Sequence, residues 1–232
     1  MKKLISILIL FTSLTVSLFA EVKIQGINGN VKVRHGVSEE WIITKVGDAL
    51  NLDDAIKVGE KSVAILIVDG SKKVIVTEKS IVDASDLRTL SQEDLLLKLA
   101  MDKILSVPAQ DRNNDLTPAH TAIIHGERKN DTHRPKKTST EAALMQLSGA
   151  KVLYDHSYYG TCILRVKDVF RINPALDADI EYKLITARSF EKSNLLSEAL
   201  NEYNSIPLNK LKPQQKQLVL ESIDRLKKRV SE

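Results

Sequence analysis

The stretch Ala64-Ile-Leu-Ile-Val-Asp-Gly-Ser-Lys-Lys-Val-Ile-Val76 decides the fold of the first half of this chain. Two apolar runs, residues 64–68 and 73–76, flank a polar turn that contains Asp69 and Gly70. Asp-Gly between two β-branched runs predicts a β-hairpin, because glycine adopts positive φ at low cost. The first run is apolar throughout, so we expect both of its faces to be covered, as in a sandwich, a barrel or a small solenoid.

The β pattern extends outward from this hairpin, from Val22 to Ala84. Short apolar runs alternate there with Gly, Asn and Asp, which is typical of short strands joined by turns. Residues 31–34 alternate apolar and polar side chains as a half-buried strand does, and residues 41–43 form another apolar run.

Helical periodicity replaces the β pattern in the second half of the chain. A first helix is expected to begin after Ser91, which can cap it, and to end before Pro108. Residues 138–141 read Thr-Ser-Thr-Glu and predict another helix start. Later breaks fall near residues 158–160, 173–174, 193–194 and 207–213. Helices of about a dozen residues with short joints suggest stacked helical hairpins.

We therefore expect an α+β protein built as two modules. The prediction is an all-β domain with a trailing helix over residues 21–106, a linker over 107–138, and an all-α domain of helical hairpins over 139–232. The linker carries a local cluster of basic residues. We favour a solvated connection over attraction to anionic lipid, glycan phosphate or nucleic acid, because these basic residues are not interleaved with aromatic ones.

The first twenty residues have the pattern of a secretory signal peptide. Lys2 and Lys3 precede an apolar run from Leu4 to Phe19, and Ala20 is a small residue at the expected cleavage position. We expect a periplasmic or otherwise exported protein, cleaved near Ala20, whose mature chain does not span a membrane. An uncleaved membrane anchor is the alternative that the sequence leaves open, although the run is short for a spanning helix, which needs roughly 20 apolar residues.

The sequence carries little that indicates catalysis. It contains no Gly-x-Ser-x-Gly elbow, phosphate-binding loop or dinucleotide fingerprint. His120 and His125 are five residues apart, which does not place them on one helical face, so we expect no metal site there. Cys162 is the only cysteine and is interpreted as a small core residue. The prediction is a non-enzymatic protein with no catalytic residues and no cofactor. Its net charge of +4 is mixed in sign along the chain, so no nucleic-acid partner is expected either.

Four short motifs follow one another in a characteristic order within the β region. They are Gly47-Asp48-Ala49-Leu50, Asp54-Ala55-Ile56-Lys57-Val58, Ser62-Val63-Ala64 and Asp69-Gly70-Ser71. From Val31 to Ala84 the chain thus resembles the FecR-like domain, with a departure at Val58, where that family usually has threonine. The resemblance implies a domain that binds other envelope proteins, or one that accompanies wall-binding modules. The aspartates and glycines in these motifs are expected to fix turns rather than to form a site.

Small, aromatic and proline residues repeat along the helical region. They are Ala150, Tyr159, Cys162 and Pro174, then Ala187, Ala199, Tyr203, Ile206 and Pro207. This spacing resembles tetratricopeptide repeats, which stack helix pairs with a period of about 34 residues. In that family the first helix of each pair lines a concave groove that holds a peptide, so Tyr154, Arg188 and Glu191 are the candidate protein-binding residues.

The sequence thus predicts an exported scaffold of the cell envelope that mediates protein–protein interaction through the two modules. A cell-wall glycan-binding module is the alternative, because FecR-like domains resemble modules found beside wall-binding domains. An undetected hydrolase is the least favoured alternative, and it requires a pocket in which titratable residues converge.

Overall fold

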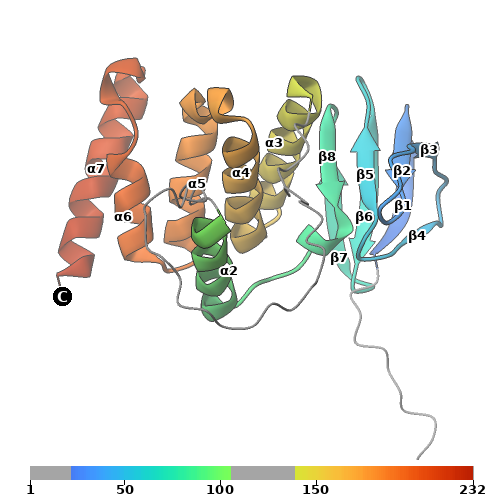
Figure 1. Cartoon of the computed structure of the whole chain (residues 1–232), viewed down its shortest axis with the longest axis horizontal. Coiled ribbons are helices and arrows are strands. Elements are labelled where there is room, and N and C mark those ends of the chain that lie inside the picture. The colour runs from blue at the N-terminus through green and yellow to red at the C-terminus, as the bar shows by residue number, and fades with distance from the viewer. Residues whose placement is uncertain (1–21, 106–138, 232) are drawn as a thin grey trace, which may run out of the picture.

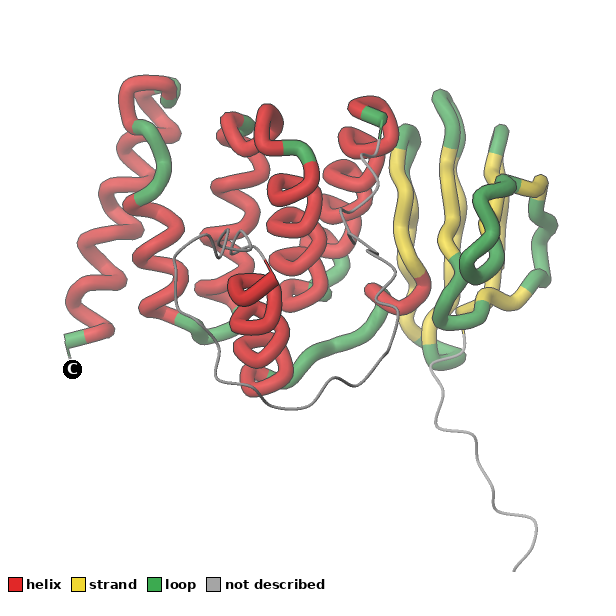
Figure 2. Tube along the Cα trace, viewed as in Figure 1, coloured by secondary structure: helices red, strands yellow, loops and turns green. Residues whose placement is uncertain are grey.

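A computed structural model describes residues 22–105 and 139–231 (Figure 1). The predicted signal peptide and the predicted linker lie outside these residues. The strands are β1 (Val22–Asn28), β2 (Val31–Arg34), β3 (Ile42–Ile43), β4 (Ala49–Leu50), β5 (Ala55–Val58), β6 (Val63–Val68), β7 (Lys72–Val76) and β8 (Ser80–Asp83). They form two antiparallel sheets with strand orders β4-β1-β6-β7 and β3-β2-β5-β8. Helices follow the sheets, which confirms the expected α+β layout (Figure 2).

The predicted hairpin is β6 and β7. Leu66 pairs with Val74, and the turn places Asp69 and Gly70 at φ values of 52° and 68°, the positive region that the Asp-Gly signal requires. The expectation that both faces of β6 are covered is only half right. Its burial alternates, with Ala64, Leu66 and Val68 buried and the residues between them half-exposed, because a second sheet covers only one face.

The two sheets form a sandwich around one apolar core. Val33 and Ile56 of the second sheet belong to the same buried cluster as Ile24 and Leu66 of the first. Two-residue alternation along each strand sends these side chains inward and leaves their neighbours outside.

Aspartate side chains fix the turns of the sandwich, as the sequence predicted. The buried carboxylate of Asp54 accepts hydrogen bonds from the backbone N–H groups of Gly36 (3.2 Å) and Asn51 (2.8 Å). Asp48 accepts one from the N–H of Lys45 at 2.8 Å. Such hydrogen bonds stabilise the turn conformation, which gives Asp48 and Asp54 a structural role.

The helices begin and end close to the predicted breaks. They are α2 (Gln92–Leu105), α3 (Thr140–Asp155), α4 (Tyr159–Ile172), α5 (Ile180–Lys192), α6 (Leu196–Asn204) and α7 (Pro213–Val230), with short 3-10 turns η1 (Ala84–Asp86), η2 (Pro174–Ala178) and η3 (Leu208–Lys210). The hydroxyls of Ser91 and Ser139 cap α2 and α3 by accepting from the N–H groups of Asp94 (3.0 Å) and Ala142 (3.2 Å). None of the helices within the described ranges is both long and apolar enough to cross a bilayer.

The helices α3 to α7 stack in sequence order, each against the next (Figure 1). The small residues Ala150, Cys162, Ala187 and Ala199 are completely buried, as expected for positions where paired helices approach closely. The sequence pattern grouped helix α2 with the β domain, but the structure places it against the other helices. It packs on α4, and its Leu95 lies in the core of the helical stack.

The two modules share one core rather than standing apart. Helix α3 lies along β8 and also contacts β7, which are the edge strands of the two sheets. Gly149 allows this approach, because a Cβ built there would lie 1.8 Å from the carbonyl oxygen of Ile81. The helix therefore covers the edge of each sheet that would otherwise present unpaired backbone groups.

Polar contacts also join the two modules where α3 and α4 meet β7, β8 and η1, a contact region that we call the seam. The N–H of Ile75, on the outer edge of β7, donates to Nε2 of His156 at 3.0 Å. Arg165 of α4 contacts both Asp83 and Asp86, with a distance of 2.9 Å from its Nε to the Asp86 carboxylate. Burial opposes ionisation of Arg165, but the two carboxylates outweigh it and raise the pKa of the guanidinium, which stays charged.

Candidate binding groove on the helical module

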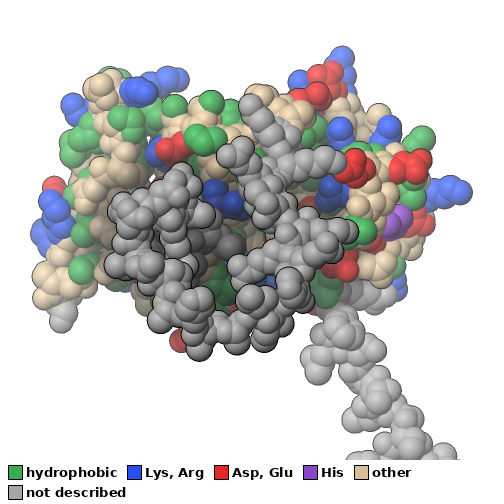
Figure 3. All heavy atoms as spheres, in the orientation of Figure 1, with side chains coloured by type: hydrophobic (Ala, Val, Ile, Leu, Met, Phe, Trp, Pro, Cys, Tyr) green, Lys and Arg blue, Asp and Glu red, His purple; other side chains and the backbone are tan. Residues whose placement is uncertain are grey.

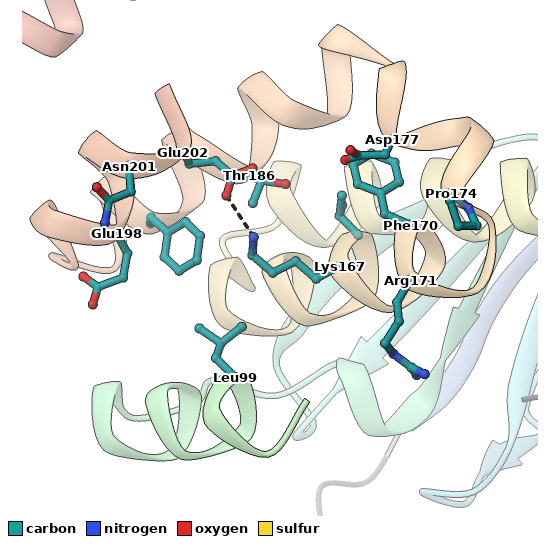
Figure 4. A pocket seen from close by; sticks show the side chains of 12 residues that line it. Leu99, Lys167, Phe170, Arg171, Pro174, Asp177, Thr186, Glu198, Asn201 and Glu202 are labelled. Atoms are coloured by element: carbon teal, nitrogen blue, oxygen red, sulfur yellow. Dashed lines mark hydrogen bonds and ion pairs between the residues drawn. The ribbon is translucent and has the colours of Figure 1, made fainter. Parts of the chain in front are cut away.

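A groove of about 610 Å³ opens between α2, α4, α5 and α6 (Figure 4). Its lining consists of Leu99, Val166, Lys167, Phe170, Arg171, Pro174, Asp177, Thr186, Phe190, Glu198, Asn201 and Glu202. The volume falls in the range of about 300–1,000 Å³ that is usual for ligand-binding clefts.

The floor of the groove is mainly apolar. Val166 and Phe170 are four residues apart on α4, and Thr186 and Phe190 are four apart on α5, so each pair lies along one face of its helix. The Thr186 hydroxyl donates to the carbonyl of Tyr182 at 2.8 Å and is thus satisfied within its own helix. Leu99 of α2 faces the floor from the opposite side (Figure 4).

A lysine bridges the groove between two helices. Nζ of Lys167 on α4 lies 2.8 Å from the carboxylate of Glu202 on α6 and 5.5 Å from the centre of the Phe190 ring. The carboxylate of Glu202 therefore balances the charge of Lys167, and the Phe190 ring adds a cation–π contact. Its aliphatic stem lies over the apolar floor (Figure 4).

Charged side chains of both signs form the rim. Arg171 pairs with Asp168 on its own helix, and Asp177 lies 3.0 Å from Nζ of Lys183. Glu198 makes no ion pair with any residue in ranges 22–105 and 139–231. An apolar floor with a polar rim and one unpaired carboxylate suits a segment that carries apolar side chains and a cation.

The sequence-predicted residues Tyr154, Arg188 and Glu191 do not line this groove. Tyr154 packs edge-on against Tyr159, with 5.6 Å between ring centres. Glu191 is engaged by Arg225 of α7, at 2.9 Å. Their role in binding stays a prediction.

The groove that the structure shows is lined by α4 and α6, the second helices of the two pairs, together with α5 and with α2, which precedes both pairs. The i,i+4 pairs of its floor are visible in the sequence. The wall that α2 supplies is not, because α2 is separated from α4 by more than fifty residues.

Cys162 is part of the core, which confirms its interpretation. Its thiol is completely buried 3.6 Å from the hydroxyl of Ser189, and burial raises its pKa to about 12. No group of three or more His, Cys, Asp or Glu side chains in the described part of the chain is placed to hold a metal ion. His120 and His125 lie outside that part.

Comparison of the chain with protein-family models, curated proteins and solved structures returned no match. The likeness to FecR-like domains and tetratricopeptide repeats therefore rests on the motifs quoted above.

Proposed function

We propose that this chain is an exported, non-enzymatic scaffold of the cell envelope, and that its helical groove holds a segment of a partner protein. The single observation that carries the proposal is the groove itself, an apolar floor enclosed by four helices. The signal-peptide pattern of residues 1–20 and the FecR-like motifs support the envelope location.

The chemistry of the groove defines the segment it would accept. The half-buried side chains of Leu99 and Phe170 provide apolar surface for one or two side chains of the segment, whereas the Phe190 ring is only 2% exposed and belongs to the core. The unpaired carboxylate of Glu198 favours a lysine or arginine beside them. We infer a basic–apolar segment, with the sandwich serving to anchor the helices rather than to contact this partner.

Site-specific photocrosslinking in living cells tests this function. A photoreactive residue in place of Asn201, an exposed residue of the groove lining, should yield an adduct with one envelope protein, while the same residue in place of Lys216, exposed on α7 outside the groove, should not. Adding Glu198→Lys, which reverses the charge that the segment's cation would meet, should abolish the Asn201 adduct. An adduct that persists with Glu198→Lys, or that forms equally from both sites, would exclude the groove as the binding surface.

A further inference from the structure

The outer face of the second sheet gathers three cations. Val31 and Val33 of β2 point into the core, so Lys32 and Arg34 point outward. Lys32 lies directly opposite Lys57 of β5 in the strand register. Like charges at such directly opposed positions destabilise a sheet. An anionic group beside Lys32 and Lys57 would relieve this repulsion.

Nothing in the described part of the chain neutralises these cations with a carboxylate. Lys32, Arg34 and Lys57 form no ion pair with residues 22–105 or 139–231. Nε of Arg34 is buried without an acceptor. Asp83, the acid that shares this face of the sheet through its pairing with Ala55, is already bound to Arg165.

An indole ring covers part of the same face. The centre of the Trp41 ring lies 5.3 Å from the guanidinium carbon of Arg34 and 5.8 Å from Nζ of Lys57. These cation–π contacts hold the ring over the strands without neutralising the charge. We call Lys32, Arg34, Lys57, Trp41 and Ile43 the basic sheet face.

Aliphatic side chains are exposed at the free edge of this sheet. Ile43 of β3 pairs with Lys32, shares its face, and is 77% exposed. Val46 beyond the strand is 59% exposed and Val37 in the preceding loop is fully exposed. Figure 1 places β3 at the end of the molecule opposite α7, away from the helical groove.

We propose that the basic sheet face docks on an anionic membrane surface. Unpaired cations attract phosphate headgroups, an indole ring favours the interface, and exposed aliphatic side chains gain by leaving water for the acyl boundary. A soluble polyanion would satisfy the cations but leave Ile43 in water. Acidic side chains also lie at this end of the molecule, as Figure 3 shows. The proposal is independent of the groove and its partner.

Tryptophan fluorescence reports on this surface directly, because Trp41 is the only tryptophan in the chain. The protein starting at Glu21, which lacks the apolar run 4–19 and retains every described residue, is mixed with phosphatidylglycerol or phosphatidylcholine vesicles. We expect co-sedimentation and a blue shift of Trp41 emission with the anionic vesicles alone, both weakened by salt.

Matched variants test whether the basic sheet face is responsible for vesicle binding. Lys32→Gln with Lys57→Gln should weaken the partition coefficient about fivefold for each cation removed, and Ile43→Ser should weaken it further. Lys227→Gln with Lys228→Gln removes the same charge from exposed positions on α7 and should change binding much less. Circular dichroism confirms that each variant is folded.

Four results would overturn the proposal. They are the absence of vesicle binding at low salt, equal weakening by the α7 control, a Trp41 shift with soluble polyphosphate but not with vesicles, and a Trp41 shift that follows protein concentration without vesicles. The third would indicate a soluble anionic polymer, and the fourth a second copy of this chain on the same face.

Discussion

Gly149→Ala is the sharpest perturbation of the seam between the two modules. The new Cβ would lie 1.8 Å from the carbonyl oxygen of Ile81 and 2.8 Å from its carbonyl carbon. Both are backbone atoms of a paired strand and cannot rotate away. Ordinary van der Waals contact begins at 3.4 Å, so α3 must move from β8 by about 1.6 Å, which opens the shared core.

The sign of the expected change separates this steric effect from helix propensity. Alanine is favoured over glycine inside a helix by about 1 kcal/mol, so without the close approach Gly149→Ala would stabilise the protein. Overpacking a well-packed core costs about 1–3 kcal/mol and occasionally more. Because the obstacle is rigid backbone, we expect the upper part of that range and a net loss of about 2 kcal/mol in the free energy of unfolding.

Urea unfolding with two probes measures both the size and the location of the effect. Trp41 fluorescence reports the sandwich, and far-ultraviolet circular dichroism reports mainly the helices. The two curves should coincide in the parent protein, because one core joins the modules. In Gly149→Ala the midpoint should fall and the curves should separate, because the damage is at the seam.

The control compares Lys151→Gly with Lys151→Ala, at an exposed position of the same helix. There the alanine variant should be the more stable by about 1 kcal/mol. If Gly149→Ala is as stable as the parent protein and its two curves still coincide, the close packing of α3 on β8 is refuted.

Three further perturbations test other parts of the structure. The Cys162 thiol, whose pKa burial raises to about 12, should resist a thiol reagent at pH 8 until the protein is denatured, and prompt labelling of the native protein would contradict its place in the core. Arg165→Met should lower the free energy of unfolding by about 3 kcal/mol, because two carboxylates lose their cation, and Asp86→Asn added to it should recover part of the loss. The N–H of Lys45 and the hydroxyl of Thr44 lower the pKa of Asp48, so its contribution to stability is present above about pH 4 and is lost as the pH falls through the lowered value. Thermal melts should therefore show a shallower acid decline for Asp48→Asn than for the parent protein, and identical declines would contradict the assignment.

The sequence predicted turns and helix starts correctly where the interactions that form them lie between residues close together in the chain. Asp69 and Gly70 adopt the positive φ values that the hairpin requires, and Ser91 and Ser139 cap the helices that the pattern predicted. Each of these features depends on residues within a few positions of one another, so a single sequence contains the whole interaction.

The groove was not predictable in this way. The sequence-based candidates Tyr154, Arg188 and Glu191 came from a family pattern that places the binding surface on the first helix of each pair. The groove that the structure shows is lined by other residues of α4, α5 and α6, and Leu99 of α2 supplies a further wall. Whether α2 packs on the sheets or on α4 depends on non-local burial, which periodicity does not reveal.

The sequence by itself determined the hairpin of β6 and β7, the starts of α2 and α3, the approximate breaks between the later helices, and the division into a β part and an α part. Only the tertiary structure decided that the modules share a core, that Gly149 allows backbone contact at the seam, and that Lys32 and Lys57 lie side by side on one face. The reason is that propensity and capping act between neighbours along the chain, whereas a seam, a groove and a charged face arise between residues that only packing brings together.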